Sequence, residues 1–317
     1  MMSLGMIRMP VDRFNGRADA SSSRPNDIVS YEKAARGSVL NIFDFTFFLL
    51  ASSFLAGLLG ALTGLGGGVV LVPLLALAFH VDMRYAVGAS LISVIATSSG
   101  AAAAYVKEGY SNIRIGMFLE IATTLGAIGG AYLATRISPN AIGIVFGLVL
   151  LYSAFVAGRP KTDAEQTGAP DPLAERLRLH GSYPVDGGWR SYRVRNVGRG
   201  FLLMAVAGIL SGLLGIGSGA VKVLAMDQVM RIPFKVSTTT SNFMIGVTAA
   251  ASAGIYLSRG YIDPGLSMPV MFGVLIGSIA GARLLVRAPV KPLRMVFSVV
   301  ILALAVEMIV NGSTGRL

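Results

Sequence analysis

The chain has 317 residues, of which 54% are hydrophobic and 14% are charged. A soluble domain typically carries about 25% charged residues, and the mean hydropathy of +0.68 also favours a membrane protein. Cysteine is absent, which excludes disulfides and thiolate metal sites. The net charge of +11 lies mainly in loops, as membrane topology requires, so nucleic-acid binding is not indicated.

Four parts follow one another along the chain. Residues 1–40 are polar and rich in serine, arginine and glycine, which predicts a disordered basic extension. Residues 41–158 form a first apolar unit and residues 199–312 a second. Between them, residues 159–198 form a polar basic loop, whose positive charge favours the cytoplasmic side of the membrane.

Each apolar unit contains five apolar elements. In the first unit we expect them at about 42–63, 67–80, 86–106, 113–136 and 139–158. In the second unit we expect them at about 199–214, 218–230, 236–257, 264–286 and 292–311. The second element of each unit falls below the roughly 20 residues that cross a bilayer. The sequence predicts an all-α polytopic membrane protein with roughly 8–10 membrane helical segments.

The two units are copies of each other. Gly215 follows Gly64 by 151 positions, and the same offset pairs Thr97 with Thr248 and Tyr105 with Tyr256. One register kept over a whole unit indicates an internal duplication. Because each unit would cross the membrane an odd number of times, the copies should be inverted repeats, each with an interrupted first helix pair, as in secondary transporters.

A glycine-rich turn interrupts each first helix pair. The turns are Gly64-Leu65-Gly66-Gly67-Gly68 and Gly215-Ile216-Gly217-Ser218-Gly219. Glycine lets a helix unwind and expose N–H groups, and the following helix start would favour an anion. Alternatively, the glycines serve only close helix packing. The duplication favours an anion site where the two turns meet.

Lys222 follows the second turn and replaces Leu71 of the first copy. An ionisable side chain in an apolar membrane segment is by default a functional hypothesis, and a lysine here would neutralise a bound anion. The alternative is that Lys222 extends to a wet interface. The substitution also predicts that the two halves of the site are chemically unequal.

The first turns of the helix after Lys235 carry hydroxyl and amide side chains, in the stretch 237–242. Ser90 of the first copy corresponds to Ser241 of this stretch. Such groups donate hydrogen bonds to oxyanions, although some should instead cap the helix or bond its backbone. The complete set of candidate substrate-binding residues is Gly64, Gly66, Gly67, Gly68, Gly215, Gly217, Ser218, Gly219, Lys222, Ser90, Ser241 and Asn242.

Glu120, Asp227 and Glu307 are acids in or near apolar stretches. Each could relay a proton, but we expect them at wet helix ends. Neither turn continues into the Gly-Lys-Ser/Thr that binds nucleotide phosphates, and no paired carboxylates or metal-ligand spacing occur in the apolar segments. The sequence therefore predicts neither an enzyme nor a cofactor.

The residues from Ala56-Gly57 through Gly64–Gly68 to Pro73, repeated from Ala207-Gly208 through Gly215–Gly219, resemble the sulfite exporter TauE/SafE family. The resemblance covers about residues 42–311. It implies a multi-pass permease of the cell inner membrane that carries sulfite, sulfonates or related sulfur-containing anions. The chain departs from the family in its basic extension, its long loop and Leu224 in place of a second proline.

The leading hypothesis is a secondary transporter of a small anion that works by alternating access of the two repeats. The expected partners are this anion and the lipid bilayer, and a homo-oligomer is left open. A passive anion channel, and a membrane scaffold whose loop 159–198 binds a partner, are the alternatives.

Overall fold

The computed structural model describes residues 42–63, 67–107, 111–157, 171–185, 188–285 and 290–315. The expected extension 1–40 and the glycines Gly64 and Gly66 lie outside them. The chain separates into two units, 1–48 and 49–317. Of the smaller unit, the structure describes the first residues of a helix, and all packing described below belongs to the larger unit.

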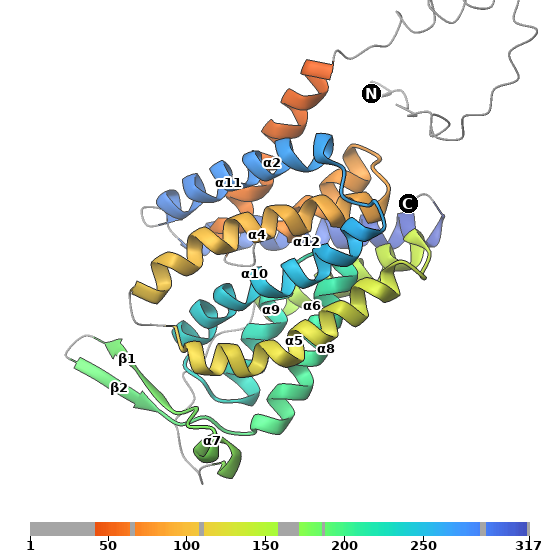
Figure 1. The fold of residues 1–317 in the computed structure, drawn as a ribbon. Helices are drawn as coiled ribbons and strands as arrows, with labels where there is room; N and C mark the ends of the chain where they lie inside the picture. The colour runs from red at the N-terminus through yellow and green to blue at the C-terminus, as the bar shows by residue number, and fades with distance from the viewer. Residues whose placement is uncertain are drawn as a thin grey trace, which may run out of the picture. The chain divides into compact units, whose positions relative to one another are not determined.

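Helices dominate the described chain, as predicted (Figure 1). Before the central loop they are α2 (Ile42–Thr63), α3 (Gly68–Pro73), the π-helical turn η2 (Leu74–Ala78), α4 (Met83–Lys107), α5 (Ile113–Ala134) and α6 (Pro139–Ala157). After it they are α8 (Val197–Leu214), α9 (Gly219–Leu224), the π-helical turn η3 (Ala225–Val229), α10 (Phe234–Ser258), α11 (Pro264–Leu285) and α12 (Val290–Ser313).

The same succession of elements occurs twice. The starts of α3, α4, α5 and α6 each recur 151 positions later, at the starts of α9, α10, α11 and α12. Both short helices continue into a π-helical turn, although Pro73 of the first copy is replaced by Leu224 in the second. The turn therefore does not depend on the proline. The joined segments 68–78 and 219–229 are roughly 16 Å long, about half of a bilayer core.

Contacts between the copies follow the same offset. Gly126 of α5 lies against the carbonyl of Ala205 of α8, and Gly277 of α11 lies against that of Phe54 of α2. Gly277 is the counterpart of Gly126 in the second copy, and Phe54 is the counterpart of Ala205 in the first copy, so the second contact repeats the first with the copies exchanged. The copies therefore contact each other with two-fold pseudo-symmetry. Their inverted orientation in the membrane stays a prediction.

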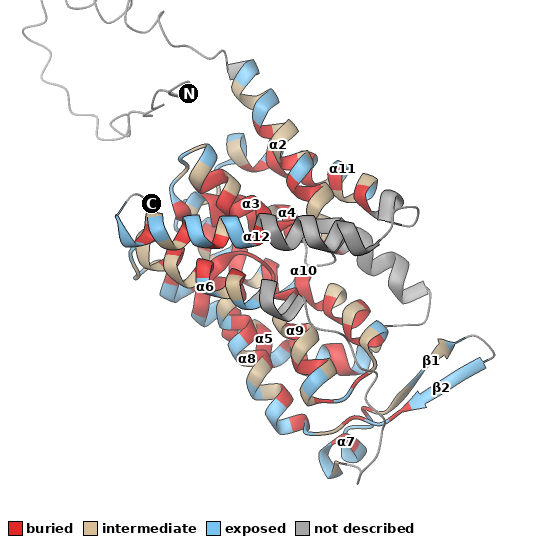
Figure 2. Cartoon of the chain, turned by 180° about the vertical axis from the view of Figure 1, so that it is seen from behind, coloured by how far each residue is buried: buried red, intermediate tan, exposed pale blue. Residues whose placement is uncertain are grey.

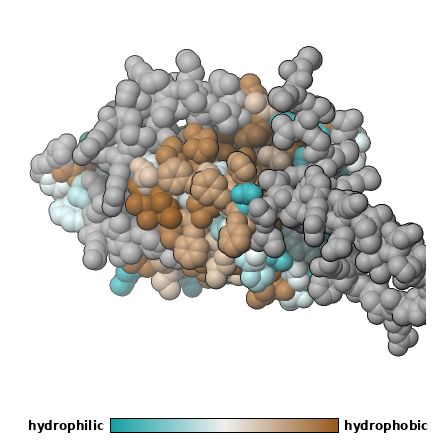
Figure 3. Space-filling model, turned by 90° about the horizontal axis from the view of Figure 1, so that it is seen from above, coloured by the Kyte–Doolittle hydropathy of each residue, from teal (hydrophilic) through white to brown (hydrophobic). Residues whose placement is uncertain are grey.

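The outward surface of the membrane helices is apolar. On α5 the exposed side chains include Met117, Ile121, Leu125 and Ile128, and their positions in the second copy are occupied by Met268, Phe272, Ile276 and Ile279, which are also exposed. Spacings of three and four residues place each set on one helix face. Figure 3 shows a contiguous hydrophobic patch among the described surface residues. Exposed apolar faces of this extent suit contact with lipid.

Three of the described helices are long and apolar enough to cross a membrane. They are Ile113–Ala134, Val197–Leu214 and the part Pro264–Gly281 of α11. Shorter apolar segments occur in α2, α4, α6 and α12. The helices α5, α8 and α10 pack against one another, and each has buried positions in Figure 2.

The described part of the central loop is structured. It contains α7 (Pro172–Arg176) and the antiparallel strands β1 (Gly181–Val185) and β2 (Gly188–Tyr192). Asp171 caps two helices, since its carboxylate accepts hydrogen bonds from the N–H groups of Leu173 and Val197 at 2.9 and 2.8 Å. Leu179 and Tyr192 belong to one buried cluster with Ile115 of α5.

Candidate functional site

Lys222 is a completely buried lysine. It lies on α9, three residues after the helix begins at Gly219, and has no exposed surface. Its ammonium donates a hydrogen bond to the hydroxyl of Thr248 on α10, with Nζ 2.5 Å from Oγ1. Thr248 lies fourteen residues after the start of the 25-residue helix α10, so the ammonium of Lys222 is bonded near the middle of that helix and is enclosed by protein.

Thr248 also contacts a carboxylate. Its Oγ1 lies 2.6 Å from Oε1 of Glu120 on α5 and 2.9 Å from the carbonyl oxygen of Met244. The same Oε1 accepts a second hydrogen bond, from Thr124, at 3.1 Å. One hydroxyl therefore links the buried lysine of the second copy to a carboxylate of the first.

Glu120 was expected at a wet helix end, and that prediction is wrong. Its side chain is 9% exposed, and it lies seven residues into α5, roughly 10 Å along the helix axis. The other two acids differ, since Asp227 on η3 is half-buried and Glu307 on α12 is exposed. Glu120 is the only acid in the 22 residues of α5, and Thr124 follows it at helical spacing.

The second glycine-rich turn has a left-handed backbone at three positions. Gly215 and Gly217 both have a φ of +69°, and Ser218 has a φ of +48°. Ser218 accepts a hydrogen bond at its carbonyl from the N–H of Lys222, at 3.0 Å. Its hydroxyl is buried and has no partner among the described residues. A left-handed non-glycine residue costs roughly 1–3 kcal/mol and tends to occur at functional sites.

The two turns meet beside α4. A Cβ placed on Gly68 would lie 2.7 Å from Oγ of Ser90 and 3.2 Å from the carbonyl oxygen of Gly215. The hydroxyl of Ser90 itself donates to that carbonyl at 2.7 Å. Gly67 precedes the first residue of α3 and is buried. Gly67, Gly68, Ser90 and Gly215 thus lie together, whereas Gly64 and Gly66 are outside the described residues.

The remaining candidates lie along α9 and α10. Ser241 is buried and donates to the carbonyl of Gly219 at 3.4 Å, and Asn242 is half-buried. Gly217 packs against Ile245. Both predicted serine donors, Ser90 and Ser241, therefore bond backbone carbonyls in this conformation, while the hydroxyl of Ser218 remains unpaired within the described residues. The substrate-binding residues predicted from sequence did not include Thr248, and Glu120 was considered only as a proton relay at a wet helix end.

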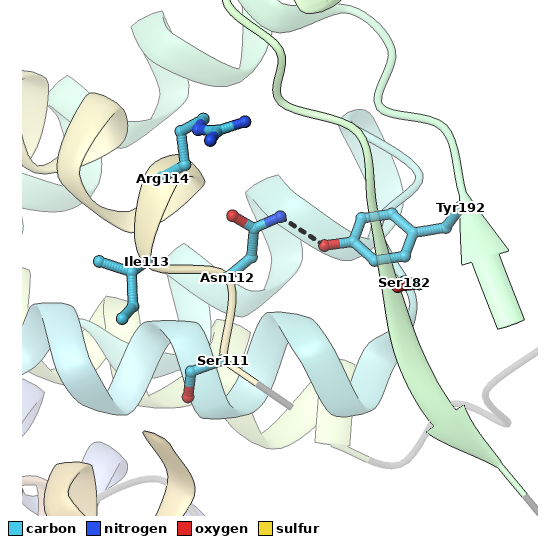
Figure 4. A pocket seen from close by; sticks show the side chains of 6 residues that line it. All are labelled: Ser111, Asn112, Ile113, Arg114, Ser182 and Tyr192. Atoms are coloured by element: carbon cyan, nitrogen blue, oxygen red, sulfur yellow. Dashed lines mark hydrogen bonds between the residues drawn. The ribbon is translucent and has the colours of Figure 1, made fainter. Parts of the chain in front are cut away.

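A separate small cavity of about 240 Å³ lies where the central loop meets the start of α5. Figure 4 shows Asn112 directed toward Tyr192 of β2, and its Nδ2 donates to the phenol oxygen at 2.7 Å. Burial raises the pKa of Tyr192 above its usual value, and the hydrogen bond from Asn112 opposes this shift. Arg114 donates to the carbonyl of Arg178 at 2.9 Å. These contacts attach the loop to the membrane helices.

A duplicated helical unit with apolar outer faces and a buried charged pair defines a membrane protein that contains a polar site. The sequence profile of the family Sulfite exporter TauE/SafE matches residues 49–308. The chain therefore belongs to the TauE/SafE family, whose members are named as membrane transporters and not as enzymes.

Curated relatives agree with this assignment. The chain is 26% identical over 272 residues to the Probable membrane transporter protein YunE of Bacillus subtilis, a match that covers 83% of this chain and 97% of that protein. It is 26% identical over 231 residues to YdhB of the same organism, covering 73% and 86%. It is 20% identical over 266 residues to ORF9 of Sinorhizobium sp, covering 83% and 92%. No solved structure matches the chain.

Proposed function

We propose that the chain is a multi-pass secondary transporter of the cell inner membrane that carries a small anion, sulfite or a short organosulfonate, by alternating access. The buried ammonium of Lys222 is the observation that carries this proposal. A lysine is rarely buried in a membrane segment unless it binds or pairs with an anionic group. The family name supports a sulfur-containing anion as the substrate.

The surroundings of Lys222 suit an oxyanion. An ammonium has three N–H donors, and the described residues provide a hydrogen-bond acceptor for one of them, at Thr248. The unpaired hydroxyl of Ser218 lies one helical turn before Lys222 and adds an uncharged donor. Sulfite and sulfonate oxygens accept both kinds of hydrogen bond. An anion in this place would be neutralised mainly by the second copy, so the two copies would contribute unequally to its binding.

The pseudo-symmetric contacts support alternating access. The two turns lie against each other at Gly68 and Gly215, and each copy packs against the other through glycine-to-carbonyl contacts. A site between two related halves can be opened to either side when one half moves against the other. The glycines let the helix backbones of the two copies approach closely.

The test is uptake of radiolabelled sulfite and of a short alkyl sulfonate into proteoliposomes. Lys222→Gln should abolish uptake, and Lys235→Gln, which changes an exposed lysine on α10, should leave it unchanged. Wild-type uptake should saturate and show counterflow, in which unlabelled anion inside the vesicle drives entry of labelled anion. Uptake without saturation or counterflow would show a channel. Undiminished uptake by Lys222→Gln would refute the assigned site.

The loop provides a second control. If the protein were a scaffold that acts through the loop 159–198, reconstituted wild-type protein would show no anion flux at all. A carrier should keep counterflow when the exposed residues of β1 and β2 are replaced, because these strands lie outside the membrane helices. Absence of anion flux in the reconstituted wild-type protein would contradict the carrier proposal.

A further inference from the structure

Glu120 has one carboxylate oxygen without a partner. Oε1 is near the hydroxyls of Thr124 and Thr248, but Oε2 is buried and accepts no hydrogen bond from the described residues. A charged oxygen that is buried and unpaired is costly, and a proton bound to Oε2 would remove that cost. Oε2 is therefore the atom on which a proton would be held.

Thr248 couples the protonation state of Glu120 to the hydrogen bonding of Lys222. A hydroxyl has one proton to donate and accepts through its lone pairs. While Thr248 accepts from Lys222, it donates either to Oε1 of Glu120 or to the carbonyl of Met244, which is 2.9 Å away. An ionised Glu120 attracts that proton. A neutral Glu120 is a weaker acceptor, so Thr248 can turn to Met244.

Lys222 is the charged group that acts on Glu120 among the described residues. α5 packs against α8 and α10. The titratable side chains of those two helices are Arg199 and Lys235, both exposed, and Tyr256, whose hydroxyl donates to the carbonyl of Gly212 at 3.2 Å. On α5 itself Arg114 is exposed and Tyr132 lies near the opposite end. The charge balance of the site is thus set by Lys222 and Glu120.

The charges of the pair determine what else the site can hold. With Lys222 protonated and Glu120 ionised, the pair is neutral. A singly charged anion beside Lys222 would leave a net charge of −1 in a buried, apolar place, which carries a large desolvation cost. One proton on Glu120 restores neutrality. The empty site and the site with anion plus proton then carry the same net charge.

We propose that Glu120 is the proton-binding residue of this transporter, and that it takes up one proton as a singly charged anion binds at Lys222 and gives it up as the anion leaves. The inference rests on the proposed function, because it places the anion at Lys222. Proton and anion move in the same direction, no covalent bond changes, and the cycle moves no net charge across the membrane.

The experiment uses proteoliposomes loaded with a pH-sensitive dye and an inward gradient of a short alkyl sulfonate. A sulfonate is a strong-acid anion and brings no titratable proton of its own. Wild-type protein should acidify the vesicle interior as the sulfonate enters, and uptake should be unaffected by membrane voltage. Glu120→Gln, which resembles the protonated form, should keep sulfonate counterflow and lose the acidification. Glu120→Asp should retain part of it.

Glu307→Gln is the matched control, since it removes an exposed carboxylate of α12 and should leave acidification intact. Wild-type counterflow without acidification would overturn the role of Glu120 and leave the anion carrier standing. Acidification by Glu120→Gln equal to that of wild type would also overturn it. Absence of counterflow with every sulfonate and with sulfite would remove both proposals. The wild-type measurement decides the question even if a Glu120 variant fails to fold.

Discussion

The ammonium of Lys222 and the hydroxyl of Thr248 lie 2.5 Å apart between α9 and α10, and this contact joins the two copies because Thr248 also reaches Glu120 of α5. The copies differ at this point. In the first copy Leu71 occupies the position of Lys222, and the hydroxyl of Thr97, the counterpart of Thr248, bonds the backbone of its own helix. Two differences between the copies therefore create the charged site: Lys222 stands where the first copy has Leu71, and Glu120 stands where the second copy has Met271.

Replacing Thr248 with valine tests that contact. The change keeps the shape of the side chain but leaves Lys222 and Oε1 of Glu120 with one hydrogen bond fewer each, so we expect a loss of about 1–3 kcal/mol of stability. Thr97→Val is the matched control, since among the described residues its hydroxyl donates to the carbonyls of Ser93 and Val94, within its own helix. Thermal unfolding in detergent measures both. Equal melting temperatures for the two variants would contradict the network.

Adjacent glycines on α5 test the helix packing. Gly130 lies against the backbone carbonyl of Ile209 on α8, whereas a Cβ on Gly129 would meet nothing within 4 Å. Gly130→Ala must push α5 and α8 apart, which should cost about 1–3 kcal/mol. Gly129→Ala should be neutral or stabilising by up to about 1 kcal/mol, because alanine favours a helix. The apparent unfolding temperatures of the two single variants give the comparison.

Much of the fold could be predicted because both of its determinants are visible in the sequence itself. Apolar runs of bilayer length specify membrane helices, and the offset from Gly64 to Gly215 specifies the duplication. The starts of α4 and α10 obey that offset in the structure. The hairpin of β1 and β2 was not foreseen, since the sequence around Gly188 carries little alternation between polar and apolar residues.

The site could be predicted only in part. Lys222 was recognisable because it interrupts an apolar run and breaks the repeat. Glu120 was misplaced because hydropathy gives a residue's position along a helix but not the face it turns toward other helices. Thr248 looked like one more hydroxyl in α10, and only packing brings it between Lys222 and Glu120. Long-range contacts of this kind carry no local signal.

The junction of the two turns makes a further prediction. A Cβ on Gly68 would lie 2.7 Å from Oγ of Ser90, so Gly68→Ala should destabilise the protein and slow anion uptake. Ser90→Ala should cost about 1 kcal/mol, the value of its hydrogen bond to Gly215. The double variant removes the clashing atom and should be more stable than the sum of the two changes predicts. Strict additivity in a thermal unfolding cycle would show that the turns do not meet at these residues.

Asp171 provides a test of how the central loop is attached. Its carboxylate caps α7 through the N–H of Leu173 and α8 through the N–H of Val197. Asp171→Ala removes both caps, at about 1 kcal/mol each, and Asp171→Asn keeps one, because its amide has a single acceptor oxygen. Limited trypsin digestion should therefore cleave at Arg176 and Arg178 fastest in the alanine variant, more slowly in the asparagine variant and slowest in wild type. Identical cleavage rates in all three proteins would show that Asp171 does not hold the loop. Sulfonate counterflow should persist in both variants, because the hydrogen-bonded residues Lys222, Thr248 and Glu120 lie on α9, α10 and α5 and not on the loop.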